Sequence, residues 1–201
     1  TGEDSRIKEI FDTAKRTIDL CCSTEYIWDG VKRDRLVWIG DIYPEMIAFT
    51  TLYGSGDIIE NSLDFIREQS PIPEWMNQIP AYSMWWIIIC ADYYKRTGRK
   101  EFAERQIEYM SAALKMMNDF VKENGELDYP MYFVDWPTHD QVDELAGFRA
   151  INIIACKKAI EFFNAFEKDT SVAEELLAKL LKVEMNVEYA KQVIALKYFA
   201  I

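Results

Sequence analysis

The chain has 201 residues, half of them hydrophobic, and a formal net charge of −11 at pH 7. This length accommodates one domain or at most two, with a sizeable core. The acidic balance excludes a general nucleic-acid-binding role, which needs a basic face to neutralise phosphates, and it argues equally against binding to anionic membranes. The longest apolar run, 84–91 (MWWIIICA), is far shorter than the ~18 residues of a membrane span.

The composition gives little support to metal or disulfide chemistry. The four cysteines form no CxxC pair, and a single histidine cannot build a zinc cluster. We therefore expect free, mostly buried thiols, no metal and no cofactor. The sequence lacks an initiator Met and a signal-peptide pattern, so we expect a processed product or a piece of a longer chain.

Apolar residues recur at helical spacing almost throughout, which predicts an all-α protein. Helices are expected over residues 7–18, 44–52, 57 onward, 83–95, 100–122, 143–166, 171 onward and 187–201. Asp57 with Glu60 has the spacing of a capping box, as does Ser171 with Glu174. Gly98 is a typical helix stop.

The predicted fourth helix indicates how these helices are layered. Its central run, 84–91, is apolar on every side, and a helix of this kind is buried all round. Such enclosure is typical of the inner helices of a double-layered helical toroid. Only 127–136 resembles a strand, and Pro130 weakens that assignment.

Two irregular segments, 26–41 and 123–140, concentrate charged and aromatic residues. In the first (YIWDGVKRDRLVWIGD), the groups able to contact a ligand are Asp29, Asp34, Asp41, Arg33, Arg35, Trp28 and Trp38. Gly30 and Gly40 are expected to permit unusual backbone angles beside them. Sugar recognition uses this combination, because carboxylates accept paired hydroxyls and flat aromatic faces pack on C–H patches. We expect the two segments to lie at one end of the helical array and to face each other.

Each of these residues also has a structural interpretation. Asp41 could cap the following helix, Asp34 could pair with a neighbouring arginine at the surface, and Trp38 could belong to the core. A solvated-loop or helix-cap role is favoured for a second set of residues, His139, Asp140, Asp143 and Glu144. Three carboxylates and two tryptophans in one loop nevertheless favour a ligand site for the first segment.

The stretch 29–41 (DGVKRDRLVWIGD) closely resembles the signature segment of glycoside hydrolase family 78, the α-L-rhamnosidases. The family pattern is roughly Asp-Gly-x-x-Arg-(Glu/Asp)-Arg-Leu-x-Trp-x-Gly-Asp. Two weaker landmarks, 79–86 (IPAYSMWW) and 133–137 (FVDWP), also resemble that family. The resemblance implies an (α/α)6 toroid, of which residues 1–201 would form about the first half, six or seven helices arranged as hairpins.

The resemblance also implies roles for individual residues. Asp34 occupies the position of the general acid, where many members have the longer Glu, and Arg33 lies beside it. Asp29 and Asp41 match carboxylates that hold rhamnose hydroxyls. The aromatic positions around the sugar are Trp38, Tyr82 and Trp136, with Asp135 accompanying the last.

The implied reaction is the inverting hydrolysis of terminal α-L-rhamnosides. One carboxylic acid protonates the leaving oxygen while a second carboxylate, roughly 6.5–9.5 Å away, activates water on the opposite face. The family's general base is a Glu from the second half of the toroid, so we expect it after Ile201 and expect little turnover from this chain alone. The expected partner is a rhamnose-containing glycan or glycoside, with self-association through helices near the two chain ends.

Other functions remain open on the sequence. The chain could be a non-catalytic helical module that binds carbohydrate, a helical scaffold for protein interaction, or another (α/α)6 enzyme. The enzyme hydrolyses rhamnosides, whereas a carbohydrate-binding module does not. A protein-interaction scaffold is distinguished from both because it does not bind rhamnose. The compartment is left open between the periplasm and the cytoplasm of a bacterium.

Overall fold

The computed structural model describes residues 4–188 and 190–201, and this part of the chain is all-α, as predicted. Its α-helices are α1 (Ser5–Cys21), α2 (Ile39–Tyr53), α3 (Asp57–Gln69), α4 (Pro80–Thr97), α5 (Lys100–Asp119), α6 (Glu144–Ala165), α7 (Ser171–Leu180) and α8 (Lys191–Ala200). Two single-turn 3₁₀ helices, η1 (Met76–Gln78) and η2 (Trp136–Thr138), lie in the connections. Each of the eight segments expected to be helical corresponds to one of these α-helices, which is one more than the upper count of seven implied by the resemblance, and 127–136 forms no strand.

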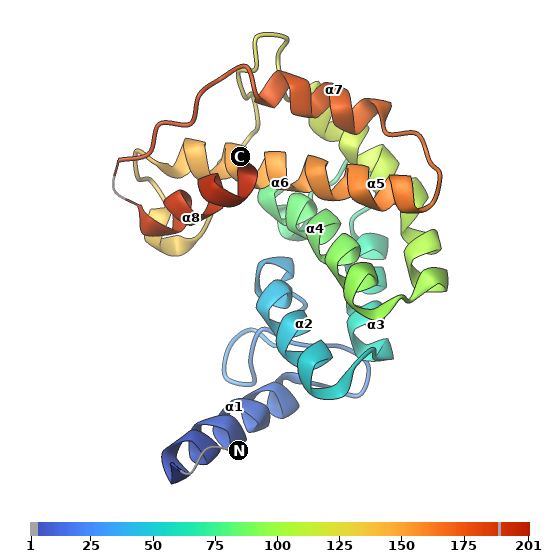
Figure 1. Ribbon diagram of the computed structural model, residues 1–201, viewed down its shortest axis with the longest axis vertical. Helices are drawn as coiled ribbons and strands as arrows, with labels where there is room; N and C mark the ends of the chain where they lie inside the picture. The colour runs from blue at the N-terminus through green and yellow to red at the C-terminus, as the bar shows by residue number, and fades with distance from the viewer. Residues whose placement is uncertain (1–3, 189) are drawn as a thin grey trace.

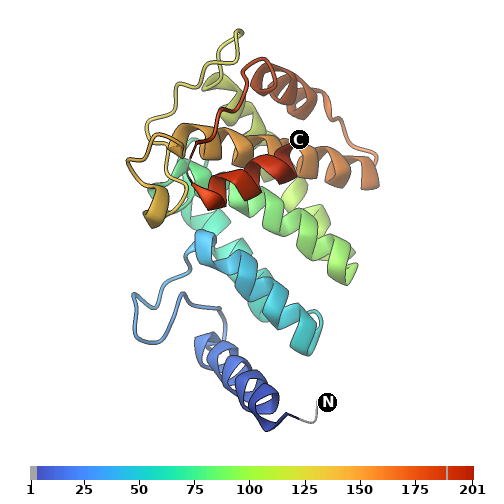
Figure 2. The same cartoon turned by 60° about the vertical axis from the view of Figure 1, so that its left-hand side comes forward.

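The helices form a curved array of two layers (Figures 1 and 2). The inner layer consists of α2, α4, α6 and α8, each packed against the next, while α3, α5 and α7 cover them from outside. Helix α1 projects at one end of the array, against α2 (Figure 1). This alternation of inner and outer helices along the chain is the hairpin arrangement that the sequence predicted.

The four inner helices run in the same direction. Near the start of α2 and α4, Gly40 lies against the ring of Tyr82, and near their ends Arg96 donates to Thr50. Lys158 on α6 pairs with Asp92 on α4 at 2.6 Å, again at corresponding heights along the two helices. Lys157, in the second half of α6, donates to the carbonyl of Ala200 at the end of α8 at 2.7 Å, so all four inner helices present their N-terminal turns at one end of the array.

Several helix boundaries differ from the prediction. Helix α2 begins at Ile39, so Pro44, expected at its start, is the sixth residue of the helix. Proline has no N–H to donate to the carbonyl four residues earlier, which made a later start the natural expectation. Helix α5 ends at Asp119 rather than Lys122, and α8 begins at Lys191 rather than near 187.

The two predicted capping boxes are wrong, and the predicted stop at Gly98 is confirmed. Gly56 is the N-cap of α3, without a side-chain bond. Glu60 is instead buried between α3, α4 and α5, where it accepts hydrogen bonds from Tyr93 at 3.1 Å and from Arg99 at 2.5 Å. Helix α7 begins after Thr170, again without a side-chain cap. Gly98 ends α4 in the left-handed conformation, φ 68°.

The core follows the apolar pattern of α4. Every residue of 84–91 is buried except Trp85, which turns toward the concave side of the inner layer. The thiols are free, as predicted, and those of Cys21, Cys90 and Cys156 are buried. Within the described residues, no helix has the length and apolarity needed to cross a bilayer.

Candidate functional site

The loop before α2 is folded around the carboxylate of Asp29. This side chain is fully buried, and it accepts hydrogen bonds from the backbone N–H groups of Asp34 at 3.2 Å and Leu36 at 3.0 Å. Gly30 next to it has φ 146°, which a residue with a side chain rarely adopts. Asp29 therefore determines the shape of the loop that carries the other predicted site residues.

Arg33 joins this loop to the first turn of α2. Its guanidinium lies 3.4 Å from the Asp29 carboxylate and 3.3 Å from that of Asp41. Burial raises the pKa of Asp41, an effect that Arg33 opposes and that the negative charges of Asp29 and Asp135 reinforce. Asp41 is the third residue of α2 and lies inside the first turn, so it is not the helix cap.

Asp34 lies on the solvent side of the same loop. Its residue is exposed, and its carboxylate accepts a hydrogen bond from the indole N–H of Trp38 at 3.1 Å. The indole of Trp38 in turn meets the ring of Tyr82 edge-on, with centroids 6.2 Å apart. The predicted acid is thus connected to an aromatic wall rather than to a neighbouring arginine.

Aromatic contacts connect the two irregular segments. Tyr82 packs edge-on against Phe133, with ring centroids 6.3 Å apart, and Phe133 packs against Trp136 at 5.3 Å. Together with the contact between Trp38 and Tyr82, these rings form a continuous row from the loop before α2 to the loop before α6. The prediction that Trp38 and Trp136 lie at one end of the array is therefore confirmed.

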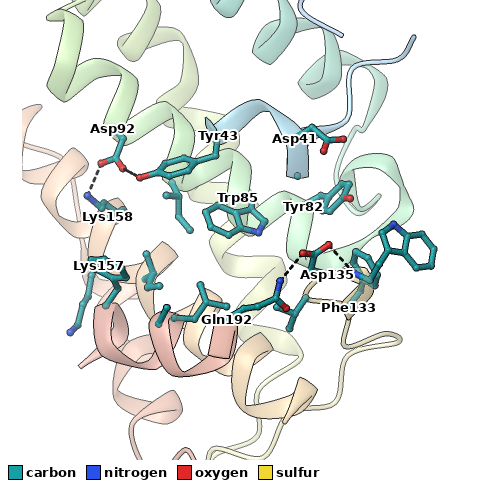
Figure 3. A pocket seen from close by; sticks show the side chains of 18 of the residues that line it. Asp41, Tyr43, Tyr82, Trp85, Asp92, Phe133, Asp135, Lys157, Lys158 and Gln192 are labelled. Atoms are coloured by element: carbon teal, nitrogen blue, oxygen red, sulfur yellow. Dashed lines mark hydrogen bonds and ion pairs between the residues drawn. The ribbon is translucent and has the colours of Figure 1, made fainter. Parts of the chain in front are cut away.

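A cavity of about 1020 Å³ occupies the concave side of the inner layer (Figure 3). Five of the predicted site residues line it: Arg33, Asp41, Tyr82, Asp135 and Trp136. They come from the two loops and from the first turns of α2 and α4. The other three predicted residues, Asp29, Asp34 and Trp38, do not line the cavity and are instead hydrogen-bonded to one another within the loop.

Residues that the sequence prediction missed line the rest of the cavity. Asp92 accepts hydrogen bonds from the phenol of Tyr43 at 2.9 Å and from Lys158 at 2.6 Å (Figure 3). Burial, with a smaller contribution from the Asp92 charge, raises the pKa of Tyr43 to about 12. The face of Trp85 lies between this polar group and Tyr82. No motif marked these residues, because each belongs to a regular helix. Only on α4 does the spacing of the cavity-lining residues, Tyr82, Trp85, Ile88 and Asp92, indicate a shared face.

Glu45, one helical turn after Asp41, is a second missed carboxyl group. Burial raises its pKa to about 8, and the charges of Asp41 and Asp29 add to that effect. One of its oxygens is buried without a hydrogen-bond partner among the described residues. A helix beginning at Pro44 would separate Asp41 from Glu45, whereas the observed start at Ile39 places them on one face.

Two small features fix the first turn of α2 against its surroundings. A side chain at Gly40 would come within 2.7 Å of the Tyr82 ring, so glycine is needed there for close approach. Its backbone is helical, contrary to the expected unusual angles. The amide of Asn77 in η1 accepts from the N–H of Ile39 at 3.1 Å and donates to the carbonyl of Val37 at 3.1 Å.

A possible set of metal ligands lies beside the cavity. Ligand atoms of His139, Asp140 and Glu144 lie within 4.8 Å of one another. The Glu144 carboxylate is hydrogen-bonded by the Asp140 N–H at 3.1 Å and lies 3.2 Å from His139 Nδ1, so these groups account for the turn before α6. Asp143 is the N-cap residue of α6, although without a side-chain cap bond to that helix. It is buried rather than solvated and accepts from the N–H groups of Glu188 and Ala190.

The arrangement defines a class of protein. Paired helices alternate between two layers, and loops and helix N-termini at one end place carboxylates and aromatic rings around one cavity of about 1020 Å³. This is the arrangement of part of a six-hairpin glycosidase toroid. The chain belongs to the bacterial α-L-rhamnosidase six-hairpin glycosidase domain family, whose sequence model matches residues 1–174. No curated protein matches the sequence.

Proposed function

We propose that the cavity binds the terminal α-L-rhamnosyl unit of a glycan or glycoside and that the site serves its inverting hydrolysis. The observation that carries this proposal is the convergence of Asp41, Tyr82, Asp135 and Trp136 on one cavity. These residues come from three separate parts of the sequence, around positions 41, 82 and 135–136. Membership of a glycosidase family supports the same chemistry.

The proposed roles follow from the groups present. Asp41 and Asp135 accept ligand hydroxyls, and the rings of Tyr82 and Trp136 pack against C–H faces of the sugar. Arg33 holds the carboxylates of Asp29 and Asp41 in register through its two ion pairs. Asp34 donates a proton to the leaving oxygen, and a second carboxylate activates water on the opposite face of the ring.

One observation favours the alternative of a carbohydrate-binding module without hydrolysis. Asp34 does not line the cavity, and its carboxylate is already hydrogen-bonded to Trp38. In that case the same wall of carboxylates and rings serves recognition alone. Binding of L-rhamnose without release of sugar from any rhamnoside, by the full-length protein, would select this alternative.

The test of the enzyme is Asp34→Asn in the full-length protein. We expect turnover of rhamnosides with poor leaving groups to fall by about 10²-fold or more, the usual contribution of a general acid. The loss should be smaller for an activated aryl leaving group, which needs less protonation. Asp119→Asn, at an exposed position on the end of α5, is the matched control. Equal losses on both substrates would show that Asp34 is not the acid.

A further inference from the structure

The inner helix α8 lines the cavity with a residue of its first turn, as α2 and α4 do. Asp41 is the third residue of α2, Tyr82 the third of α4 and Gln192 the second of α8, and all three line the cavity. The inner helices share one direction, so these first turns lie at the same end of the array. Gln192 lies outside the 1–174 match to the family, and nothing in the sequence assigned it a role.

Gln192 makes a direct contact with one of the predicted site residues. Its side-chain amide N–H donates to Oδ2 of Asp135 at 2.8 Å (Figure 3). The other carboxylate oxygen accepts from the backbone N–H of Trp136 at 2.8 Å. Both oxygens of Asp135 are therefore held, although the residue belongs to an irregular and exposed loop.

The amide orientation of Gln192 follows from its surroundings. A carboxylate only accepts hydrogen bonds, so the NH₂ group and not the carbonyl must face Asp135. The carbonyl oxygen of Gln192 is then buried without a hydrogen-bond partner in the described part of the chain. Leaving a buried acceptor without a hydrogen bond is costly. The side chain of Gln192 accepts this cost in order to donate to Asp135, which indicates that the bond to the carboxylate is the important one.

We propose that Gln192 is a positioning residue of the sugar site, which holds the Asp135 carboxylate against the cavity so that it can accept hydroxyl groups of a polyhydroxylated ligand. This inference rests on the proposed function, since it assigns to α8 a part in recognising the same sugar. Without the amide, Asp135 keeps only the backbone bond to its neighbour and is free to turn toward solvent. The charge of Asp135 also contributes to the raised pKa of Asp41, which indicates that the two carboxyls lie close together on the cavity wall.

The decisive variant is Gln192→Glu, which keeps the size of the side chain and replaces the donor with a second carboxylate. Two carboxylates at this distance cannot both ionise without strong repulsion. We expect the affinity for L-rhamnose, measured by calorimetry, to fall at least about 10-fold at pH 7.5. The loss should shrink at pH 5, where the pair can share a proton. Gln141→Glu, at an exposed position of the same loop, should change neither value.

A second measurement reports the contact without any sugar. The backbone N–H of Trp136 donates to Asp135, so its signal in ¹⁵N-tryptophan-labelled protein should move in Gln192→Glu, in a pH-dependent way, and stay in place in Gln141→Glu. Unchanged rhamnose affinity together with an unmoved Trp136 signal would overturn the inference. Failure of the unsubstituted protein to bind rhamnose would instead refute the proposed function, and the Trp136 signal would still decide whether Gln192 holds Asp135.

Discussion

At the level of single residues, Asp29 and Asp41 of the segment 29–41 have different roles. Asp29 is fully buried and bonded to the backbone of its own loop, whereas Asp41 lines the cavity and is bonded to Arg33. A substitution of Asp29 therefore acts on the shape of the loop, and a substitution of Asp41 acts on the site itself. The motif alone gave both residues the same role, because residue type and spacing do not reveal which hydrogen bonds a carboxylate already accepts.

The buried carboxyl of Glu45 predicts a pH dependence of stability. Its pKa is about 8 in the folded protein, against 4.5 for an ordinary glutamate. Between these values the unfolded chain has lost the proton that the folded protein still holds, so unfolding becomes easier as the pH rises. Because one pKa unit corresponds to about 1.4 kcal/mol, we expect the free energy of unfolding to fall by a few kcal/mol from pH 5 to pH 8.

The variant Glu45→Gln mimics the protonated carboxyl and isolates this contribution. We expect urea unfolding of the variant to show a much smaller loss of stability over pH 5 to 8 than the unsubstituted protein. Glu25→Gln, at an exposed position of the preceding loop, should leave the pH profile as it was. The same slope in Glu45→Gln as in the unsubstituted protein would mean that other groups cause it.

At the level of elements, the packing of α2 against α4 depends on one missing side chain. Gly40 lets the Tyr82 ring lie against the first turn of α2, and Tyr82 in turn meets Trp38 and Phe133. This contact aligns the first turns of two inner helices. The position of Tyr82 on the cavity wall thus follows from the fit between two helices rather than from its own loop.

Gly40→Ala should therefore be destabilising although alanine is the better helix former. We expect a loss of about 1–3 kcal/mol in the free energy of unfolding, since the added methyl group would overlap the Tyr82 ring. In a Tyr82→Ala background the same change should be neutral or stabilising by up to about 1 kcal/mol, as helix propensity alone predicts. A double-mutant cycle of urea unfolding measures both. Equal effects in the two backgrounds would show that Tyr82 does not need the glycine.

The sequence predicted most of the helices and the shared end of the two irregular loops, because apolar periodicity and clustered polar residues are local signals. It failed at the start of α2, where Pro44 is tolerated inside a helix, and at Glu60, whose capping spacing was overridden by contacts with Tyr93 and Arg99. Gln192 and Glu45 were missed for a related reason. Their roles come from neighbours distant in sequence, or from a helix boundary that the local pattern misplaced.

At the level of the whole molecule, both ends of the array expose apolar side chains. They are Ile7, Ile10 and Phe11 on α1, and Ile194, Tyr198 and Phe199 on α8. Tyr198 and Phe199 are 78 % and 71 % exposed. Exposed apolar groups gathered on one helix favour association, with burial contributing roughly 25 cal/mol per Å².

We predict that the 201-residue chain self-associates in solution through these helices. Sedimentation velocity over a concentration series should show the average mass rising in the micromolar range. The double substitution Tyr198→Ser/Phe199→Ser should reduce it, and Glu9→Ser, at an exposed polar position of α1, should not. A strictly monomeric protein at all concentrations would contradict the prediction.

The common direction of the inner helices bears on how such a site can diversify. Each inner helix faces the cavity with side chains of its own, so a change at one of them alters one wall of the site while the hairpin framework behind it stays the same. Repeat proteins vary their binding surfaces in the same way while their framework stays constant. Ligand preference in this architecture can therefore evolve, or be engineered, one hairpin at a time, with positions 41, 82, 135 and 192 as a compact set for a combinatorial library.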